Sequence, residues 1–237
     1  MSDALANRRS IIAGVAATLA APAKIAWTKG HRRRFHDSFR DGVGQWVVET
    51  EKPAQVSATD GVLDIIAPAG LTAWFRPVLS GAVAIEYEVR AIQAGGPFDR
   101  VSDVNCFWMA QDPKASAGDV LAHPRSGRFA DYDDLQTYYV GLGGNTNSTT
   151  RFRRYIGRAG DRPILPENDR RGPEDLLVAN VWQRLRITAD GPTIRFARDG
   201  RTLFDFHDPA PYTRGRFGLR TTASHLQVRD FSIIALD

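Results

Sequence analysis

Arginine, asparagine and tyrosine side chains gather in one stretch of this sequence, residues 134–155. Its second half is β-branched and aromatic, which predicts a strand whose side chains alternate between two faces. Arg151, Arg153 and Tyr155 would then share one face, and Arg154 would lie on the other. The planar donors of a guanidinium suit carboxylates, phosphates and the vicinal hydroxyls of sugars. The stretch therefore predicts a ligand site, although a solvated arginine-rich face would have the same pattern.

An acidic sugar is the ligand that would use all of these groups. Elimination at a uronate needs a group that neutralises the carboxylate and a base that takes the neighbouring proton. Arg153 and Arg154 fit the first role, and Tyr138 or His225 fits the second, unless His225 is a turn residue bonded to backbone. We expect β-elimination by a polysaccharide lyase, with these further side chains binding the substrate: Asn105, Tyr139, Asn145, Asn147, Arg151 and Tyr155.

Two other functions stay open. A glycoside hydrolase needs two carboxyl groups, and Asp103 is the candidate for one of them, with the acidic run 131–134 as a source of the other. That run could also bind calcium or be a surface cluster. A non-catalytic carbohydrate-binding module needs only aromatic and hydrogen-bonding side chains. The scattered histidines show no ligand spacing, so we expect no metal and no cofactor. Cys106 lies in an apolar run, which indicates a buried, inert thiol.

The elements that must position these groups are short strands. Asp-Gly pairs such as Asp60-Gly61, Asp190-Gly191 and Asp199-Gly200 stand between alternating apolar runs, as in β-hairpins. Roughly a dozen strands and no convincing helix predict an all-β, antiparallel β-sandwich. Two separate strands, 215–221 and 226–236, would close it. The long loop 111–134 is of a kind that is often functional.

The first residues predict export. Arg8-Arg9 precede a short, alanine-rich apolar run, as in a twin-arginine signal, which we place at residues 1–23. A basic leader (24–34) and one catalytic or carbohydrate-binding domain (35–237) would follow. The protein would reach the periplasm or be secreted, with no membrane attachment once the signal is removed. The net charge of +4 without a lysine-rich tract argues against nucleic acid as a partner. We expect a monomer that takes a poly- or oligosaccharide.

The two ends of the domain resemble a known fold family. Phe35-His-Asp-Ser-Phe39 near the start and Gly215-Arg-Phe-Gly-Leu-Arg220 near the end are similar to concanavalin-A-like jelly rolls of the laminarinase and lectin type, and distantly to 3-keto-disaccharide hydrolase domains. The central runs 102–110 and 138–155 resemble an exported bacterial branch associated with carbohydrate degradation. The resemblance implies a sugar ligand. The chain lacks the Glu-x-Asp-x-x-Glu motif of laminarinase-type hydrolases, so their mechanism does not carry over.

Overall fold

The structure is a computed structural model that describes residues 32–236. The segment predicted as an export signal, with Arg8 and Arg9, lies outside the described residues. The first strand begins at Arg32, within the segment expected as a basic leader, and pairs with the end of the last strand. Arg32 to Arg34 therefore belong to the sheet.

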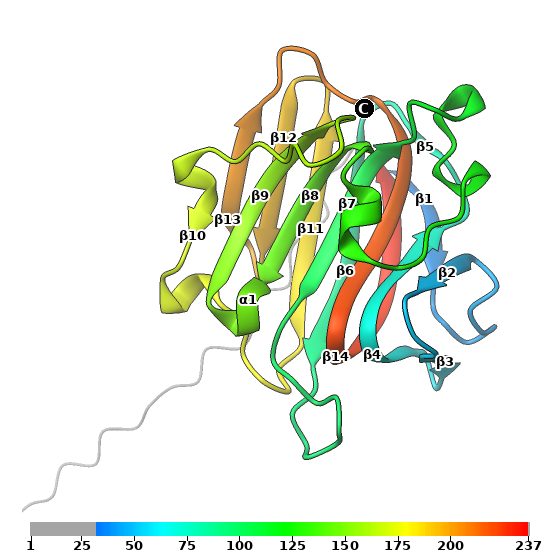
Figure 1. Cartoon of the computed structure of the whole chain (residues 1–237), viewed down its shortest axis with the longest axis vertical. Coiled ribbons are helices and arrows are strands. Elements are labelled where there is room, and N and C mark those ends of the chain that lie inside the picture. The colour runs from blue at the N-terminus through cyan, green and yellow to red at the C-terminus, as the bar shows by residue number, and fades with distance from the viewer. Residues whose placement is uncertain (1–31, 237) are drawn as a thin grey trace, which may run out of the picture.

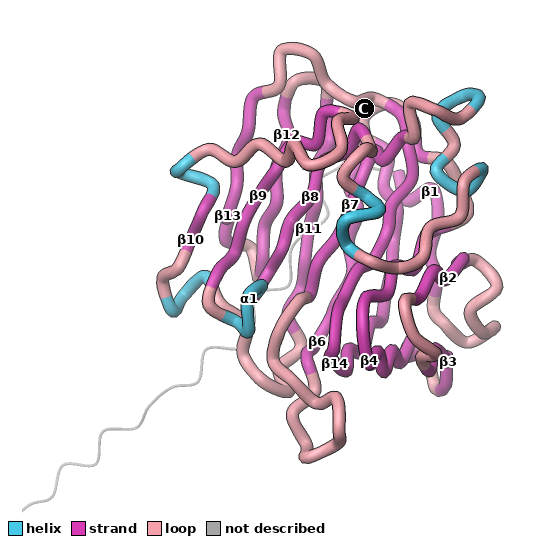
Figure 2. Tube along the Cα trace, viewed as in Figure 1, coloured by secondary structure: helices cyan, strands magenta, loops and turns pink. Residues whose placement is uncertain are grey.

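The strands form one curled antiparallel sheet that folds into two packed layers (Figure 1). The first layer has the order β10-β9-β8-β7-β14-β4-β2. Figure 2 shows how strands dominate the chain and how loops join them at the two ends of the layers. The strands of this layer have these bounds: β2 (Trp46–Thr50), β4 (Val62–Phe75), β7 (Val104–Gln111), β8 (Gln136–Gly143), β9 (Thr149–Ile156), β10 (Asp169–Arg170) and β14 (Arg214–Ala235).

The second layer has the order β13-β12-β11-β6-β14, with β1 along the end of β14 and β3 along the start of β4. A short strand, β5, pairs with the beginning of β14. The bounds are β1 (Arg32–Asp37), β3 (Gln55–Thr59), β5 (Leu79–Ser80), β6 (Val83–Ala91), β11 (Gln183–Asp190), β12 (Thr193–Arg198) and β13 (Arg201–His207).

Two long strands, β4 and β14, run through both layers. The sequence predicted two closing strands after Gly215, but β14 is continuous across 22 residues. Its register against β4 shifts between Thr222 and Ser224, where Ala223 has a positive φ of 45°. A bulge of this kind bends a strand and increases its twist, which lets one strand pass from one layer to the other.

Within residues 32–236, helical structure is limited to short turns: η1 (Ser116–Gly118), η2 (Val120–Ala122), η3 (Phe129–Tyr132), α1 (Gly144–Asn147), η4 (Pro166–Asn168) and η5 (Pro173–Asp175). None of the helices in the described part of the chain is long and apolar enough to cross a membrane. The all-β antiparallel sandwich expected from the sequence is confirmed.

The main core lies between the layers and is rich in aromatic rings. Strand β7 is buried over nearly its whole length. Cys106 is 1% exposed within it, and burial raises the pKa of the thiol to about 12. At neutral pH the thiol is therefore protonated and shielded, and the predicted buried cysteine is confirmed.

Candidate functional site

The candidate site lies on the outer face of the first layer, the face turned away from the core. One part of this face, over β14, β4 and β2, is covered by the loop 112–135; we call it the covered half. The part over β8, β9 and the start of β7 is uncovered, and we call it the open half. In Figure 1 the green loop runs in front of the covered half, while the lower parts of β8 and β9 stay clear and the yellow-green segment after β9 crosses only their upper parts.

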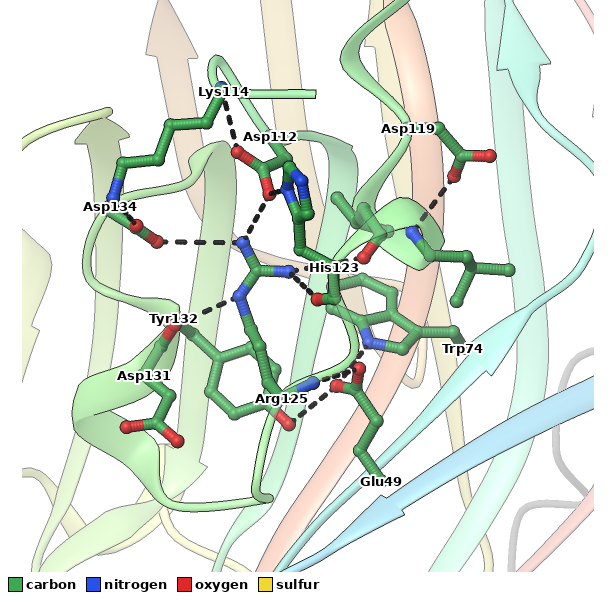
Figure 3. A network of polar contacts seen from close by, with 12 residues as sticks. Glu49, Trp74, Asp112, Lys114, Asp119, His123, Arg125, Asp131, Tyr132 and Asp134 are labelled. Atoms are coloured by element: carbon green, nitrogen blue, oxygen red, sulfur yellow. Dashed lines mark hydrogen bonds and ion pairs between the residues drawn. The ribbon is translucent and has the colours of Figure 1, made fainter. Parts of the chain in front are cut away.

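Glu49 of β2 holds the loop over the covered half (Figure 3). Its carboxylate accepts hydrogen bonds from Trp74 Nε1 at 2.9 Å, Tyr132 Oη at 2.8 Å and the Arg125 backbone N–H at 2.8 Å. Glu49 is 6% exposed, so this charge is buried and is compensated by three donors from two different segments. The rings of Trp74, Phe107 and Tyr132 stack beneath the loop.

A second set of contacts ties the loop to itself. The guanidinium of Arg125 donates to Asp112 at 2.9 Å and to the backbone oxygens of Val120 and His123 at 3.1 Å each. Asp112 also lies 3.0 Å from His123 Nδ1. These bonds join the beginning of the loop to its middle, so the loop is a fixed cover (Figure 3).

The open half contains a pocket of about 450 Å³. This volume is within the range of small-molecule sites in proteins. Residues distant in the sequence meet there because the sheet order places β9, β8 and β7 side by side. The pocket is lined by Arg100, Asp103, Phe129, Tyr139, Gly141, Gly144, Asn145, Thr146, Thr149, Arg151, Arg153, Arg162 and Thr222.

One wall of the pocket is cationic. Arg151 is paired with Asp169 through two bonds of 2.9 and 3.0 Å, and Arg162 lies 3.4 Å from Asp133. Arg153 instead donates to the backbone oxygen of Arg162 and has no carboxylate partner among residues 32–236. Burial lowers the pKa of Arg153, and the charges of Arg162 and Arg151 lower it further. The wall therefore carries one guanidinium, that of Arg153, that forms no ion pair within residues 32–236, although the Asp133 carboxylate acts on it from a longer distance.

The facing wall carries a carboxylate held in place by donors. Asp103 accepts from Arg100 at 3.1 Å, from the Ser102 hydroxyl and from Asn105 Nδ2 at 3.2 Å. Asp103 precedes β7 and has a positive φ of 58°. Such a conformation is sparsely populated for residues other than glycine, and it aims the side chain at the pocket edge.

The turn α1 closes the pocket at the end of β8. Asn145 and Thr146 both have left-handed dihedral angles, with φ values of 52° and 58°. For a β-branched threonine this conformation is strained, and such strain is found preferentially at functional sites. Gly143 begins the turn with φ 66°, where a Cβ would lie 2.4 Å from Leu177 Cδ1. Asn145 Nδ2 donates to Thr149 Oγ1 at 3.1 Å at the rim.

Of the two tyrosines predicted to bind substrate, Tyr139 lines the pocket and Tyr155 does not. Tyr139 packs against Phe129 and Tyr155, with ring centroids 5.4 and 5.6 Å apart. Burial raises the pKa of Tyr139 well above its usual value, so its phenol is protonated at neutral pH. Tyr155 is fully buried in the aromatic cluster below the pocket.

Two predicted catalytic residues, Tyr138 and Arg154, lie on the wrong face of the sheet. Tyr138 points into the core, donates to Asp208 at 2.5 Å and accepts from the Tyr212 backbone N–H at 3.0 Å. Arg154 donates to the same Asp208 at 2.6 Å and lies over the Tyr212 ring. Strand alternation separates both residues from the pocket, and their contacts fasten the segment after β13 to the first layer.

His225 and Asn147 are also removed from the pocket by their partners. His225 lies between two carboxylates, with Nδ1 2.8 Å from Asp99 and Nε2 2.9 Å from Asp64. Both of its nitrogens are occupied, so it is not a free base. Asn147 uses its amide on the backbone of Leu177, at 3.0 and 2.8 Å, and so holds the base of the turn.

The predicted set is therefore divided. The structure brings Asp103, Tyr139, Asn145, Arg151 and Arg153 to one pocket, and it places Asn105 behind Asp103 as a support. The Asp131–Asp134 run does not reach the pocket: Asp131 binds Ser126, and Asp134 binds Lys114. In the described part of the chain no group of three or more His, Cys, Asp or Glu side chains could hold a metal ion.

Sequence reasoning missed four residues of the pocket that lie outside the stretch 134–155. Arg100 and Thr222 come from segments without a motif, and they meet because Arg100 Nη2 donates to the Thr222 backbone oxygen at 2.8 Å. Phe129 lies in the loop 112–135, and Arg162 lies in the segment between β9 and β10. The Arg162 guanidinium is 4.9 Å from the Phe129 ring centroid. The length of the loop 111–134 was a signal of function, but it could not indicate which side chain faces a ligand.

Several solved structures share this fold. A protein of unknown function with a galectin-like fold from Bacillus subtilis is 16% identical, with a TM-score of 0.65 over 87% of this chain and 100% of that chain. The carbohydrate-binding module CBM66 from Bacillus subtilis is 13% identical, with a TM-score of 0.53 over 80% of this chain and 94% of that one. The exoplasmic/lumenal domain of VIP36, in a form bound to Ca²⁺ and Man3GlcNAc, is 11% identical, with a TM-score of 0.58 over 88% and 91%.

These likenesses establish a galectin-like, lectin-type jelly roll, which confirms the fold that the end motifs resembled. None of the curated proteins matches the sequence. A family pattern does match, over residues 65–231, which span the strands from β4 to β14 and include every residue that lines the pocket. The chain therefore belongs to the family described as a domain of unknown function, DUF6250.

Proposed function

We propose that this protein is exported and binds an acidic saccharide, with a uronate carboxylate held by Arg153 in the pocket of the open half. The observation that carries the proposal is the guanidinium of Arg153, which faces the pocket and forms no ion pair with a carboxylate within residues 32–236. Two other arginines, Arg151 and Arg162, lie on the same wall. A partly buried cation among cations is unfavourable until an anion arrives, and a guanidinium matches a carboxylate in shape.

The remaining pocket groups suit the neutral part of a sugar. The Asp103 carboxylate and the Asn145 amide offer acceptors and donors for hydroxyl groups. Phe129 and Tyr139 supply apolar surface at one side. The fold supports this reading, because proteins with it include a carbohydrate-binding module and a lumenal domain seen with a bound oligosaccharide.

A pair of neighbouring arginines gives a matched test of binding. Arg153 and Arg154 are adjacent on β9 but point to opposite faces. Calorimetric titration with an oligouronate should show Arg153→Ala losing about 1.5–3 kcal/mol of binding free energy, roughly tenfold or more in affinity. Arg154→Ala should bind as the unsubstituted protein does. Equal losses in both variants, or binding of the carboxyl-reduced, neutral oligosaccharide with unchanged affinity, would refute the proposal.

Salt should act on the same contact. The pocket is open to water, so added salt screens the attraction between Arg153 and the carboxylate. Affinity for the oligouronate should fall as sodium chloride increases, and the residual affinity of Arg153→Ala should depend on salt less steeply.

Elimination of the acidic glycan is a second candidate, favoured by one feature of the register. Tyr139 lies directly opposite Arg153 across β8 and β9, and both line the pocket. With Arg153 on the carboxylate, Asp103 would take the proton next to it, and the C–O bond to the leaving sugar would break. Tyr139, protonated, would donate its proton to the departing oxygen.

Analysis of the products distinguishes elimination, hydrolysis and binding without cleavage. Elimination yields an unsaturated uronate, whose formation is measured by its absorbance. Tyr139→Phe should abolish this product while the variant retains its affinity for the glycan. New reducing ends without unsaturation would indicate a hydrolase that uses Asp103, on an ordinary or a 3-keto glycoside. Binding without cleavage of any acidic glycan would leave a carbohydrate-binding module.

A further inference from the structure

A row of mostly polar side chains crosses the outer face of the first layer from edge to edge. The strand registers place its members opposite one another on successive strands. An extended glycan that crossed this face of the sheet would lie along this row. In order from β10 to β2, the row consists of Asp169, Arg151, Gly141, Asn105, Arg220, Thr72 and Glu49.

The loop 112–135 fills the part of this row that lies in the covered half. Arg220 donates to the Gly127 backbone oxygen at 3.1 Å and to Thr72 Oγ1 at 2.9 Å. A Cβ on Gly127 would lie 2.4 Å from the Glu51 backbone nitrogen. The loop backbone is thus in direct contact with the strands, and a sugar cannot pass between them.

The open part of the row is bounded by the edge of the loop, by the turn after β8 and by the segment around Arg100. Phe129 stands at the edge of the loop, where the Arg220 guanidinium lies 4.7 Å from its ring centroid. At the other end of β8, the turn of Asn145 and Thr146 forms the rim. Towards β14, the bond from Arg100 to the Thr222 backbone closes the margin beside Asp103. The open half is therefore a pocket with a blocked inner end.

From this geometry we propose that the pocket takes the terminal residue of an acidic glycan, and that it does not hold an internal stretch of the chain. The inference rests on the binding of an acidic saccharide proposed above and specifies which part of the saccharide is bound. An internal residue needs an exit for the chain on both sides, and the loop occupies one of them. A terminal residue needs one exit, through the mouth of the pocket.

The pocket's charge agrees with a single terminal carboxylate. Arg151, Arg162 and Arg100 each have a carboxylate partner, so Arg153 is the lining arginine left for a ligand anion in the described part of the chain. A terminal uronate supplies one carboxylate at the depth where Arg153 lies. The following residues would extend into solvent and add little affinity.

Titration of oligouronates of increasing length tests the inference. Terminal binding predicts one protein per chain at every length, from the dimer to the polymer, and an affinity per chain that does not increase. A second ligand, an oligouronate whose non-reducing terminal carboxyl has been reduced to an alcohol, tests one terminus. A matched ligand carries the reduction at the reducing-end residue.

We expect one of these two ligands to lose affinity by roughly tenfold or more, as Arg153→Ala does, and the other to bind normally. A number of bound proteins that rises with chain length, or normal binding of both reduced ligands, would overturn terminal recognition and leave saccharide binding standing. Failure of every oligouronate to bind would overturn the proposed function, and this inference with it.

Discussion

The covered and open halves of one sheet face use the same residue types in opposite ways. Under the loop, Arg220 is 3% exposed and is bonded to backbone and hydroxyl oxygens between the rings of Phe129 and Tyr132. In the open half, Arg153 faces a pocket and has no carboxylate partner within residues 32–236. The comparison teaches that an arginine on this face is structural where the loop surrounds it, and we propose that it is available to a ligand where a single backbone oxygen is its hydrogen-bond acceptor.

Substitution of Glu49 should release the loop from the covered half and cause the largest loss of stability. Glu49→Ala leaves the donors of Trp74, Tyr132 and Arg125 buried without an acceptor. We expect the free energy of unfolding to fall by about 3–5 kcal/mol, measured by chemical denaturation. Asp205→Ala is the control, since its pair with Arg195 is about half exposed on both sides and should change stability by less than about 0.5 kcal/mol. Similar losses in the two variants would show that the loop is not held by Glu49.

Two consecutive glycines sharpen the contrast at the rim of the open half. Gly143→Ala puts a side chain on a left-handed residue and against Leu177, so we expect a loss of about 2–3 kcal/mol in stability. The backbone of Gly144 is outside the left-handed region, and a Cβ there would lie 3.5 Å from its nearest atom, Thr149 Oγ1. Gly144→Ala should therefore change stability by less than about 0.5 kcal/mol. Thermal or urea unfolding measures both. A Gly143→Ala protein as stable as the Gly144→Ala protein would show that the turn is not constrained.

The neighbouring arginines of β9 should separate stability from binding. Arg154→Ala removes a charged partner from Asp208, which is 2% exposed, and should cost about 2 kcal/mol in unfolding free energy. Arg153→Ala removes a charge that burial and its neighbours disfavour, so stability should stay the same or rise slightly. Urea denaturation without ligand gives the comparison. A large loss from Arg153→Ala would mean that its guanidinium supports the fold and is not reserved for a ligand.

The sequence predicted the fold and about half of the site for physical reasons that can be named. Alternation along the strand Thr149–Ile156 correctly placed Arg151 and Arg153 on one face, because side-chain period in a strand depends only on local geometry. Asp-Gly pairs located the hairpins for the same reason. The apolar run around Cys106 correctly indicated a buried thiol. Each of these signals is contained within a few neighbouring residues.

Errors arose where contacts between distant segments decide a residue's role. Tyr138 was proposed as the base because it lies in the same stretch as Arg153, yet Asp208, 70 residues away, fixes it in the core. His225 is occupied by Asp64 and Asp99 from two other segments. The covered half could not be foreseen, since nothing in the loop sequence tells that Arg125 and Tyr132 reach Glu49.

A histidine at the margin of the open half should give the smallest effect, visible through pH. His225 joins Asp64 of β4 to Asp99, which precedes Arg100 at the pocket edge. Burial disfavours its charge, but the hydrogen bonds to Asp64 and Asp99 outweigh burial and raise the pKa of His225 above its usual value. Gln227 also donates to Asp64, so this carboxylate keeps one partner when His225 is neutral.

The sign of the pH effect follows from that raised pKa. The protonated His225 stabilises the fold fully below its unfolded-state pKa of about 6.5, and this stabilisation is lost as pH rises through the folded-state pKa. The stability difference between the unsubstituted protein and His225→Gln should therefore shrink above pH of about 6.5, by no more than about 1.4 kcal/mol per pH unit. Urea denaturation across this range measures it, with His207→Gln, at an exposed position on β13, as the control. A difference that stays constant with pH would mean that His225 is neutral in the fold, and that the margin beside Arg100 is held without its charge.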